Sequence, residues 1–284
     1  MANNSTDAER QAQADRELAL KVKLEKPMDR ELNVLFSQIA EDLRIQYAAT
    51  GAAISAYSYE SQLDAIILTN NINTSRQFSD TISGVAVSDK TTDVAIAIAA
   101  IAAFRGISTE EHLLNIQNEV NSQSRVILRN EAIYSGREIT GTIQKHIDSS
   151  IAKSQIDEDL DRGERAKKSS EDFKERSISH AATISATETQ GAAEGTKDLE
   201  RQVFMRENSA LASTLAGVAV IKMRKWWITR GDSKVRPAHV AADGQEAVDG
   251  YFSVGGELLR YPKDPNGSAA NVINCRCSEI DELF

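Results

Sequence analysis

Two cysteines and a histidine are the residues of this chain whose types and spacing suggest chemistry. Cys275 and Cys277, separated by a single residue, are the only cysteines among 284 residues. With His239 and one carboxylate, Asp232 or Asp243, the two thiols would complete a four-coordinate zinc shell. The one-residue spacing is a poorer clamp than the two-residue spacing of zinc knuckles, and the sequence has no second cysteine pair.

The alternative is that the cysteines pack in a core. Side chains two residues apart on an extended strand share a face, so Cys275 and Cys277 would fill a core as small hydrophobic residues. Arg276 would then face the other way and pair with a carboxylate, while Asn274 satisfies a turn. A disulfide between such close neighbours would be strained. We therefore predict reduced, packed cysteines with no bound metal and no cofactor.

Arg236 and His239, three residues apart after an expected strand, allow two interpretations. A guanidinium that holds a phosphate beside an imidazole general base would suit a nuclease, although the sequence offers no evident second acid–base partner. Ordered polar groups more often complete hydrogen bonds within a fold. We predict that both side chains tie loops together, that Glu188 reaches across to Arg236, and that the chain has no catalytic residue.

Residues 222–236 form a basic segment that includes the adjacent Trp226 and Trp227. Such a segment can contact nucleic-acid phosphates, stack on bases or dock on an acidic partner. It can equally be a strand whose lysines border a core that buries one tryptophan. Apart from Arg236, the basic residues of this segment are Lys222, Arg224, Lys225, Arg230 and Lys234. Both interpretations stay open for them.

The composition limits what the whole chain can do. Its 33 basic and 42 acidic residues give a net charge of −9, so the protein is not coated in positive charge and any nucleic-acid contact must be local. The N-terminal residues lack the pattern of a secretory signal, and we expect synthesis in the cytoplasm. The longest apolar run, residues 94–104, is shorter than the roughly 20 residues of a membrane-spanning helix and predicts a buried helix instead.

The elements that must position these residues divide the chain into three segments. Residues 1–30 form a charged arm, expected to be a solvated or frayed helix that stops at Pro27. Residues 31–175 form a helical docking region. Residues 176–284 form a small module with a helix broken at its glycines, a strand-like run and many turn signals. We predict an α+β fold: a long, mostly α-helical N-terminal region followed by a small α+β C-terminal module.

Periodicity and capping signals predict the helices of the middle segment. Apolar residues recur every three or four positions from Leu32 to Tyr47. Isoleucines recur every fourth position from Ile139 to Ile151, and this helix should continue through the mixed-charge residues 157–176. Ser108, with a glutamate three positions later, predicts a capping box, and residues 70–84 resemble a loop.

The order of residues in the last third forms a longer pattern: a tryptophan, Arg-x-x-His, a glycine, an aromatic residue, a Pro-x-Asp-Pro turn and Asn-Cys-Arg-Cys. This pattern, over about residues 176–280, closely resembles the C-terminal module of the bacteriophage Mu F-like minor head proteins, the phage head morphogenesis family. Thr187 and Glu188 resemble the Thr-Glu helix that precedes the module in that family. The family positions are filled here by Trp226 or Trp227, Arg236, His239, Gly244, Phe252, Pro262, Asp264, Pro265, Asn274, Cys275, Arg276 and Cys277.

The resemblance implies a function. Members of this family are minor head components that associate with the portal vertex during prohead assembly, and some are thought to leave the head with the genome. By resemblance we expect a minor capsid protein of a tailed bacteriophage, located in the virion head at the portal vertex in multiple copies. Its expected partner is the portal protein; the major capsid protein, a scaffolding protein and the packaged DNA are further candidates. The alternative is a nuclease or effector enzyme that uses His239 and Arg236.

Overall fold

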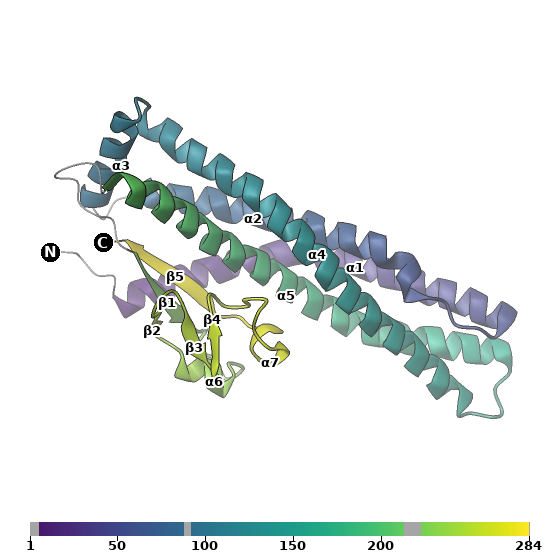
Figure 1. Ribbon diagram of the computed structural model, residues 1–284. Coiled ribbons are helices and arrows are strands. Elements are labelled where there is room, and N and C mark those ends of the chain that lie inside the picture. The colour runs from purple at the N-terminus through teal and green to yellow at the C-terminus, as the bar shows by residue number, and fades with distance from the viewer. Residues whose placement is uncertain (1–5, 88–91, 213–222, 284) are drawn as a thin grey trace. The chain divides into compact units, whose positions relative to one another are not determined.

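The computed structural model describes residues 6–87, 92–212 and 223–283, and it consists of long helices followed by a small module with strands (Figure 1). The predicted α+β fold is confirmed. No described helix combines the length and the apolar character needed to cross a lipid bilayer. The helical part comprises α1 (Asp7–Thr50), a short 3-10 helix (Ala56–Tyr59), α2 (Glu60–Val87), α3 (Thr92–Phe104), α4 (Thr109–Gln155) and α5 (Arg162–Ala212). The module comprises β1 (Met223–Ile228), α6 (Pro237–Ala241), β2 (Gln245–Glu246), β3 (Phe252–Val254), β4 (Glu257–Leu259), α7 (Ala269–Val272) and β5 (Ser278–Leu283).

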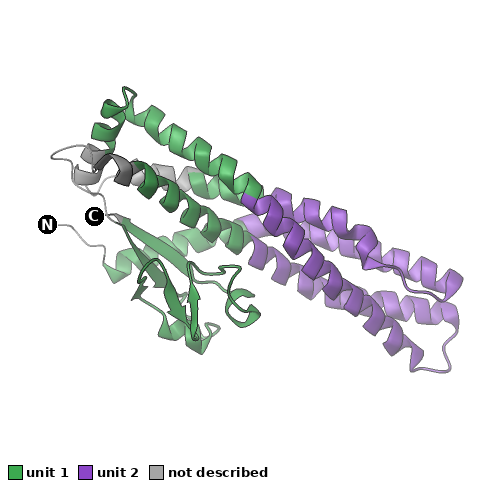
Figure 2. Cartoon of the chain, in the orientation of Figure 1, with its two compact units in different colours: residues 1–23, 72–126, 189–284 green, residues 24–71, 127–188 purple. Residues whose placement is uncertain are grey.

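The chain divides into two compact units that differ from the predicted segments (Figure 2). Unit 1 holds residues 1–23, 72–126 and 189–284, and unit 2 holds residues 24–71 and 127–188. The predicted boundary near residue 30 falls inside α1, which continues through Pro27, and the boundary near residue 175 falls inside α5. Sequence composition changes at these points, but the backbone helices do not end there.

The core of unit 2 is the apolar helix stripe that periodicity predicts. Leu32, Ile39 and Leu43 of α1 are fully buried against Ile147 of α4 and Phe173 of α5. The repeat from Ile139 to Ile151 also faces this core. Burial of each such side chain contributes about 1.5–3 kcal/mol, so this stripe is the main stabilising feature of the unit.

The structure of unit 2 differs from the helix prediction at one point. The helix expected to run from Ile139 through residue 176 is interrupted, because α4 ends at Gln155 and α5 begins at Arg162. Asp161 and Glu164 form a reciprocal capping box there: the Glu164 amide donates to Asp161 (2.8 Å), and the Asp161 amide donates to Glu164 (2.9 Å). This box satisfies amides at the start of α5 and explains the interruption.

Four further helix predictions can be compared with α2, α3, α4 and α5. The apolar run at residues 94–104 is helical within α3, and the Glu111 amide donates to Ser108 Oγ (3.0 Å), which confirms the predicted cap of α4. The expected loop at residues 70–84 is wrong, since these residues lie within α2. The expected break at Gly191 and Gly195 is also wrong, because α5 continues through both glycines. Tertiary packing overrides the weak helix propensity of glycine at these sites.

The C-terminal module of unit 1 is built from two small sheets. The first has the order β2-β1-β5 and is antiparallel throughout, with Trp226 opposite Ile280; the second is the β3–β4 hairpin. Ala14 of α1 packs against Ile228 and Ile280 of the first sheet. The N-terminal residues are therefore part of the module's support, and the expectation of a solvated arm is wrong.

Candidate functional site

His239, Cys275 and Cys277 converge in the core of the C-terminal module. His239 lies in the short helix α6, and the cysteines lie between α7 and β5. The His239 Nδ1 atom is 3.4 Å from Cys277 Sγ and 3.5 Å from Cys275 Sγ. All three side chains are buried, as the packing interpretation predicts for the cysteines, and both cysteines are free of disulfides. The arrangement joins two segments that lie 36 and 38 residues apart in the sequence.

Neighbouring side chains orient the imidazole of His239. Asn271 donates its Nδ2 hydrogen to the carbonyl oxygen of Val254 (3.2 Å), so its Oδ1 faces His239 Nε2 at 3.3 Å. Since Oδ1 can only accept, Nε2 carries the hydrogen and Nδ1 presents its lone pair to the two sulfurs. The Trp227 ring packs edge-on to the imidazole, with ring centroids 5.6 Å apart. The fold therefore fixes both the position and the tautomer of His239.

The two thiols have pKa values displaced in opposite directions. A hydrogen bond from Cys277 is the largest cause that lowers the pKa of Cys275 well below its ordinary value; burial opposes it and His239 adds to it. The same bond, with burial, raises the pKa of Cys277. Trp227 acts to lower the pKa of Cys277. Its buried indole nitrogen has no hydrogen-bond partner among the described residues. Cys275 is therefore the thiol of the pair that ionises more readily.

The carboxylates considered as a fourth zinc ligand are engaged elsewhere. Asp232 pairs with Arg276 through two bonds of 2.8 Å, and this pair meets the expectation that Arg276 binds a carboxylate. Asp243 accepts a hydrogen bond from the Thr229 amide at 2.7 Å. Asn274 adopts φ = 54°, the left-handed turn conformation that asparagine tolerates. No carboxylate, cysteine or histidine in the described ranges joins His239, Cys275 and Cys277 as a fourth ligand.

Most other family-motif residues hold the loops of the module. Arg236 donates to the carbonyl oxygen of Ile273, just before the Asn-Cys-Arg-Cys segment. Gly244 adopts φ = 71°, a conformation suited to glycine, and its amide donates to the Trp227 carbonyl (2.8 Å). Phe252 is fully buried and packs edge-on against Trp227 with centroids 5.4 Å apart. The framework role that sequence reasoning gave to Arg236 fits this contact.

The Pro-x-Asp-Pro turn is organised by Asp264. Its carboxylate accepts from the backbone and side chain of Arg260 (2.9 and 3.1 Å) and from the backbone and side chain of Asn266 (3.1 and 2.9 Å). Arg260 is also the principal group that holds the pKa of Asp264 below its ordinary value, against the upward effect of burial. Pro262 is buried and Pro265 is exposed. The turn is therefore a hydrogen-bonded hub with no free carboxylate.

The expected partner of Glu188 is wrong. Glu188 accepts a hydrogen bond from Asn71 Nδ2 at 3.4 Å, and both residues belong to unit 2. Arg236 belongs to unit 1 and donates to Ile273. Among the contacts that the structure describes, Glu188 and Arg236 thus each have a partner other than the expected one.

The basic segment does not present all of its cations and rings to a ligand. Lys225 is buried, donates to the Arg260 carbonyl oxygen (2.5 Å) and pairs with Glu279 (3.2 Å), so its assignment to nucleic-acid binding is wrong. Trp227 is fully buried, and the Arg10 guanidinium covers the Trp226 ring at 4.1 Å. Lys222 lies outside the described residues. Arg224 lies 3.9 Å from Glu246, Arg230 lies 3.5 Å from Asp232, and Arg230 and Lys234 are exposed.

Sequence reasoning missed a buried ion cluster that joins α1, α5 and β5 in unit 1. Glu194 of α5 pairs with Lys21 of α1 and with Lys197 (3.0 Å), and it accepts the Glu279 amide (3.1 Å). Lys197 also binds Glu17 of α1 (2.7 Å). Burial alone would raise the pKa of Glu194, but Lys197 and Lys21 hold it below its ordinary value. The available signal was a pair of opposite charges three residues apart, Glu194 and Lys197, in a segment rich in small residues.

A second part of the same cluster contains repelling carboxylates. Arg201 pairs with Glu279 and with Asp281 (3.3 Å). Burial, and then repulsion from Asp281, raises the pKa of Glu200 to about 8. Burial, and then repulsion from Glu279, raises the pKa of Asp281 to about 7. These two carboxyl groups titrate in the neutral range, unlike Glu194.

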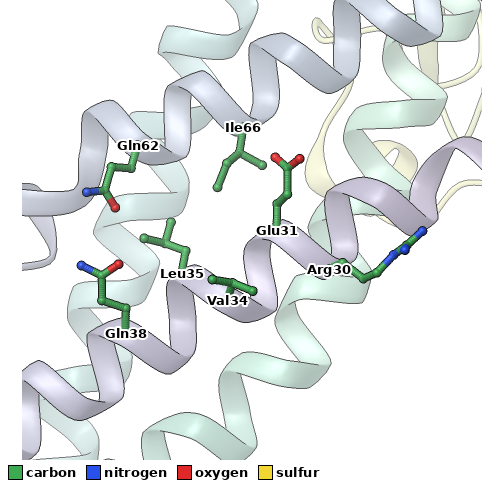
Figure 3. Close-up of a pocket in the computed structure, with 7 residues that line it drawn as sticks. All are labelled: Arg30, Glu31, Val34, Leu35, Gln38, Gln62 and Ile66. Atoms are coloured by element: carbon green, nitrogen blue, oxygen red, sulfur yellow. The ribbon is translucent and has the colours of Figure 1, made fainter.

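A pocket of about 350 Å³ lies apart from these residues, within unit 2 (Figure 3). It is formed by α1 between Arg30 and Gln38 and by Gln62 and Ile66 of α2. Leu35 and Ile66 point into the space between the two helices. Its lining holds no histidine or cysteine, and we assign it no chemistry.

Comparison of this chain with protein-family models, with curated proteins and with solved structures finds no match.

Proposed function

We propose that this protein is a minor head protein of a tailed bacteriophage that associates with the portal vertex during prohead assembly. The observation that carries the proposal is the ordered set of motif residues from the tryptophan pair to Asn-Cys-Arg-Cys. In unit 1 these residues converge on one small core, with His239, Phe252 and both cysteines packed around Trp227. A motif that forms a folding framework is consistent with a structural protein of the resembled family.

The surroundings of His239 favour this proposal over a nuclease. A general base must come within hydrogen-bond reach of a substrate proton. Only 2% of the His239 surface is exposed, and its ring nitrogens face Asn271 and the two sulfurs. The guanidinium of Arg236 is likewise engaged by a backbone carbonyl. These contacts support a framework role for both residues.

The helices of unit 2 carry exposed apolar side chains that suit contact with helices of a partner. Val34 and Ile45 of α1 are 70% and 53% exposed, and Ile133 and Tyr134 of α4 are 43% and 71% exposed. Apolar side chains exposed on a helix can anchor a partner helix that packs over them. We propose the portal protein as the partner of this surface, with several copies around the ring.

The test uses the phage that encodes this chain. Proheads from the unmodified phage should contain the protein, with density at the portal vertex in a cryo-electron microscopy reconstruction. A Val34→Asp/Tyr134→Asp variant should be depleted from proheads at least tenfold, since two buried interface anchors would each cost more than about 1 kcal/mol. Glu138→Gln, an exposed change on α4, is the matched control and should be incorporated normally.

Two results would argue against the proposal. One is a prohead population that lacks the protein although the cell expresses it; the other is normal head yield after deletion of the gene. Incubation of the purified protein with DNA and RNA tests the enzymatic alternative, since cleavage that His239→Gln abolishes would support a nuclease.

A further inference from the structure

We propose that His239, Cys275 and Cys277 form a zinc site, with Nδ1 and the two sulfurs as ligands. Tetrahedral zinc with bonds of about 2.0–2.1 Å to nitrogen and about 2.3 Å to sulfur separates those ligand atoms by about 3.6 Å. The observed distances from Nδ1 to the sulfurs are 3.4 and 3.5 Å. Among the described residues, this is the one place where at least three His, Cys, Asp or Glu side chains come close enough to hold a metal ion.

Hydrogen bonding alone explains the arrangement less well than a metal does. The lone pair of Nδ1 can accept a hydrogen bond from one thiol, yet both sulfurs lie at nearly the same distance from it. A cation between the three atoms would engage both sulfurs and the nitrogen at once. The two nearly equal distances therefore fit three ligand atoms arranged around one metal ion.

The surroundings of the imidazole are those of a metal ligand. When one ring nitrogen of a histidine binds a metal, the N–H of the other ring nitrogen typically donates to a carboxylate or a carbonyl oxygen. This hydrogen bond fixes the tautomer. Asn271 Oδ1 takes this role at His239 Nε2, and Val254 in turn fixes the amide of Asn271. The imidazole thus has an outer partner that prepares its Nδ1 atom for a cation.

The charge and stoichiometry also favour zinc. A divalent cation and two thiolates are neutral together, which lowers the cost of burying the ion with its ligands. Binding of Zn²⁺ to two thiols forms two Zn–S bonds, breaks two S–H bonds and releases two protons to solvent, with no change of oxidation state. Imidazole and thiolate in a tetrahedral arrangement favour zinc over magnesium or calcium, which prefer oxygen ligands. Since Asp232 and Asp243 are engaged elsewhere, a water molecule would take the fourth position.

The proposed ion has a structural role and does not depend on the proposed function. It would tie α6 to the segment that leads into β5, a connection otherwise made by packing and by the bond from Arg236 to Ile273. The proposal replaces the expectation, drawn from the Cys-x-Cys spacing, that the cysteines only pack. Spacing along the chain did not reveal that His239 Nδ1 faces both sulfurs.

The test is metal analysis of the full chain, purified under reducing conditions without a chelator. We expect about one zinc per chain, as for a structural zinc site. Replacement by Co²⁺ should give thiolate-to-cobalt charge-transfer absorption and the intense visible bands of tetrahedral cobalt. Native, reduced protein that holds less than about 0.1 zinc per chain after dialysis against zinc, and that gives no such cobalt spectrum, would overturn the proposal.

Variants separate the site from other histidines. Cys275→Ser, Cys277→Ser and His239→Gln should each abolish stoichiometric zinc, and Asn271→Ala, which removes an outer partner, should weaken zinc binding about 10–100-fold. His180→Gln, a change at a half-buried histidine of unit 2, is the matched control and should leave the zinc content and cobalt spectrum unchanged. Retention of zinc by the cysteine variants would contradict the proposal. The wild-type measurement decides the question even if a variant does not fold.

Discussion

The core of unit 2 and the C-terminal module of unit 1 are stabilised by different kinds of interaction. Unit 2 buries a stripe of leucine, isoleucine and phenylalanine side chains that recur at helical spacing. The module and its supporting helices bury Lys21, Glu194, Lys197 and Glu279 alongside the Trp227 core. Apolar contacts are non-directional and tolerate substitutions of similar volume, whereas buried ions depend on specific partners. The comparison therefore predicts that the two regions respond differently to the same class of perturbation.

Removal of one member of the ion cluster should have the largest effect. Glu194→Ala leaves Lys21 and Lys197 buried without their shared partner, and loss of one partner of a buried ion pair costs about 3–5 kcal/mol. The free energy of unfolding of unit 1, followed by tryptophan fluorescence in urea, measures this loss. Lys167→Ala, an exposed change in unit 2, serves as the control. A cost below about 1 kcal/mol for Glu194→Ala would show that the cluster is not a stabilising element.

A core truncation in unit 2 should cost slightly less. Leu43→Ala removes a fully buried side chain of the apolar stripe and should destabilise the protein by about 2–5 kcal/mol through lost burial and a cavity. Leu43→Met, which keeps the volume, should cost less than about 1.5 kcal/mol. Circular dichroism during urea unfolding reports both values. Equal losses for the alanine and methionine variants would contradict the apolar account of this core.

The pH dependence of unit 1 should come partly from Glu200. Its pKa is about 8 in the folded chain against an ordinary value of 4.5, so the folded state binds the proton more tightly. Stability therefore falls as the pH rises from about 4.5 to about 8, and is flat in this respect below and above that window. Glu200→Gln removes this contribution, so the loss of stability between pH 5 and pH 8.5 should be smaller in the variant than in the wild type by about 4 kcal/mol.

The measurement is urea unfolding of the wild type and of Glu200→Gln at the two pH values. Asp281 has the same sign of shift, so part of the decline should remain in the variant. Glu138→Gln, an exposed change in unit 2, should leave the pH profile unchanged. A wild-type stability that rises from pH 5 to pH 8.5 and is unaffected by Glu200→Gln would exclude this contribution.

Loss of the cap of α5 should have the smallest effect. Asp161→Ala removes the acceptor of the Glu164 amide and should destabilise unit 2 by about 1 kcal/mol. Asp161→Asn retains an acceptor and should cost only a few tenths of a kcal/mol. Thermal unfolding followed by circular dichroism distinguishes the two. An alanine variant as stable as the wild type would mean that the box does not determine where α5 begins.

The same contrast explains how much could be predicted from the sequence. The apolar stripe from Leu32 to Tyr47 was predictable because a helix repeats its own geometry along the chain. The pairing of Lys21 with Glu194, 173 residues away, was not, because no local periodicity relates two such charges. The same limit applies at Pro27. This residue predicted the end of the N-terminal helix, but α1 continues through it. Ala14 and Lys21, which precede Pro27 in α1, contact segments more than 200 residues away that no local pattern reveals.

The predictions for the motif residues also divide into those that followed from local order and those that depended on distant contacts. Their order predicted one compact module, and Arg236 and Arg276 do tie its loops together. Glu188 and Lys225 were misassigned, since burial and pairing depend on which helix face and which strand face the fold turns inward. The buried carboxylate that pairs with Lys21 and Lys197 is Glu194, six residues beyond Glu188.

Native-state hydrogen exchange of the full chain, read by mass spectrometry, tests most directly whether the N-terminal residues and the module form one folded unit. The account predicts that amides of residues 12–23 in α1 exchange with the same free energy of opening as those of β1 and β5, and that Glu194→Ala lowers both together. Rapid exchange of residues 12–23 as a frayed arm, with β1 and β5 still fully protected, would contradict it.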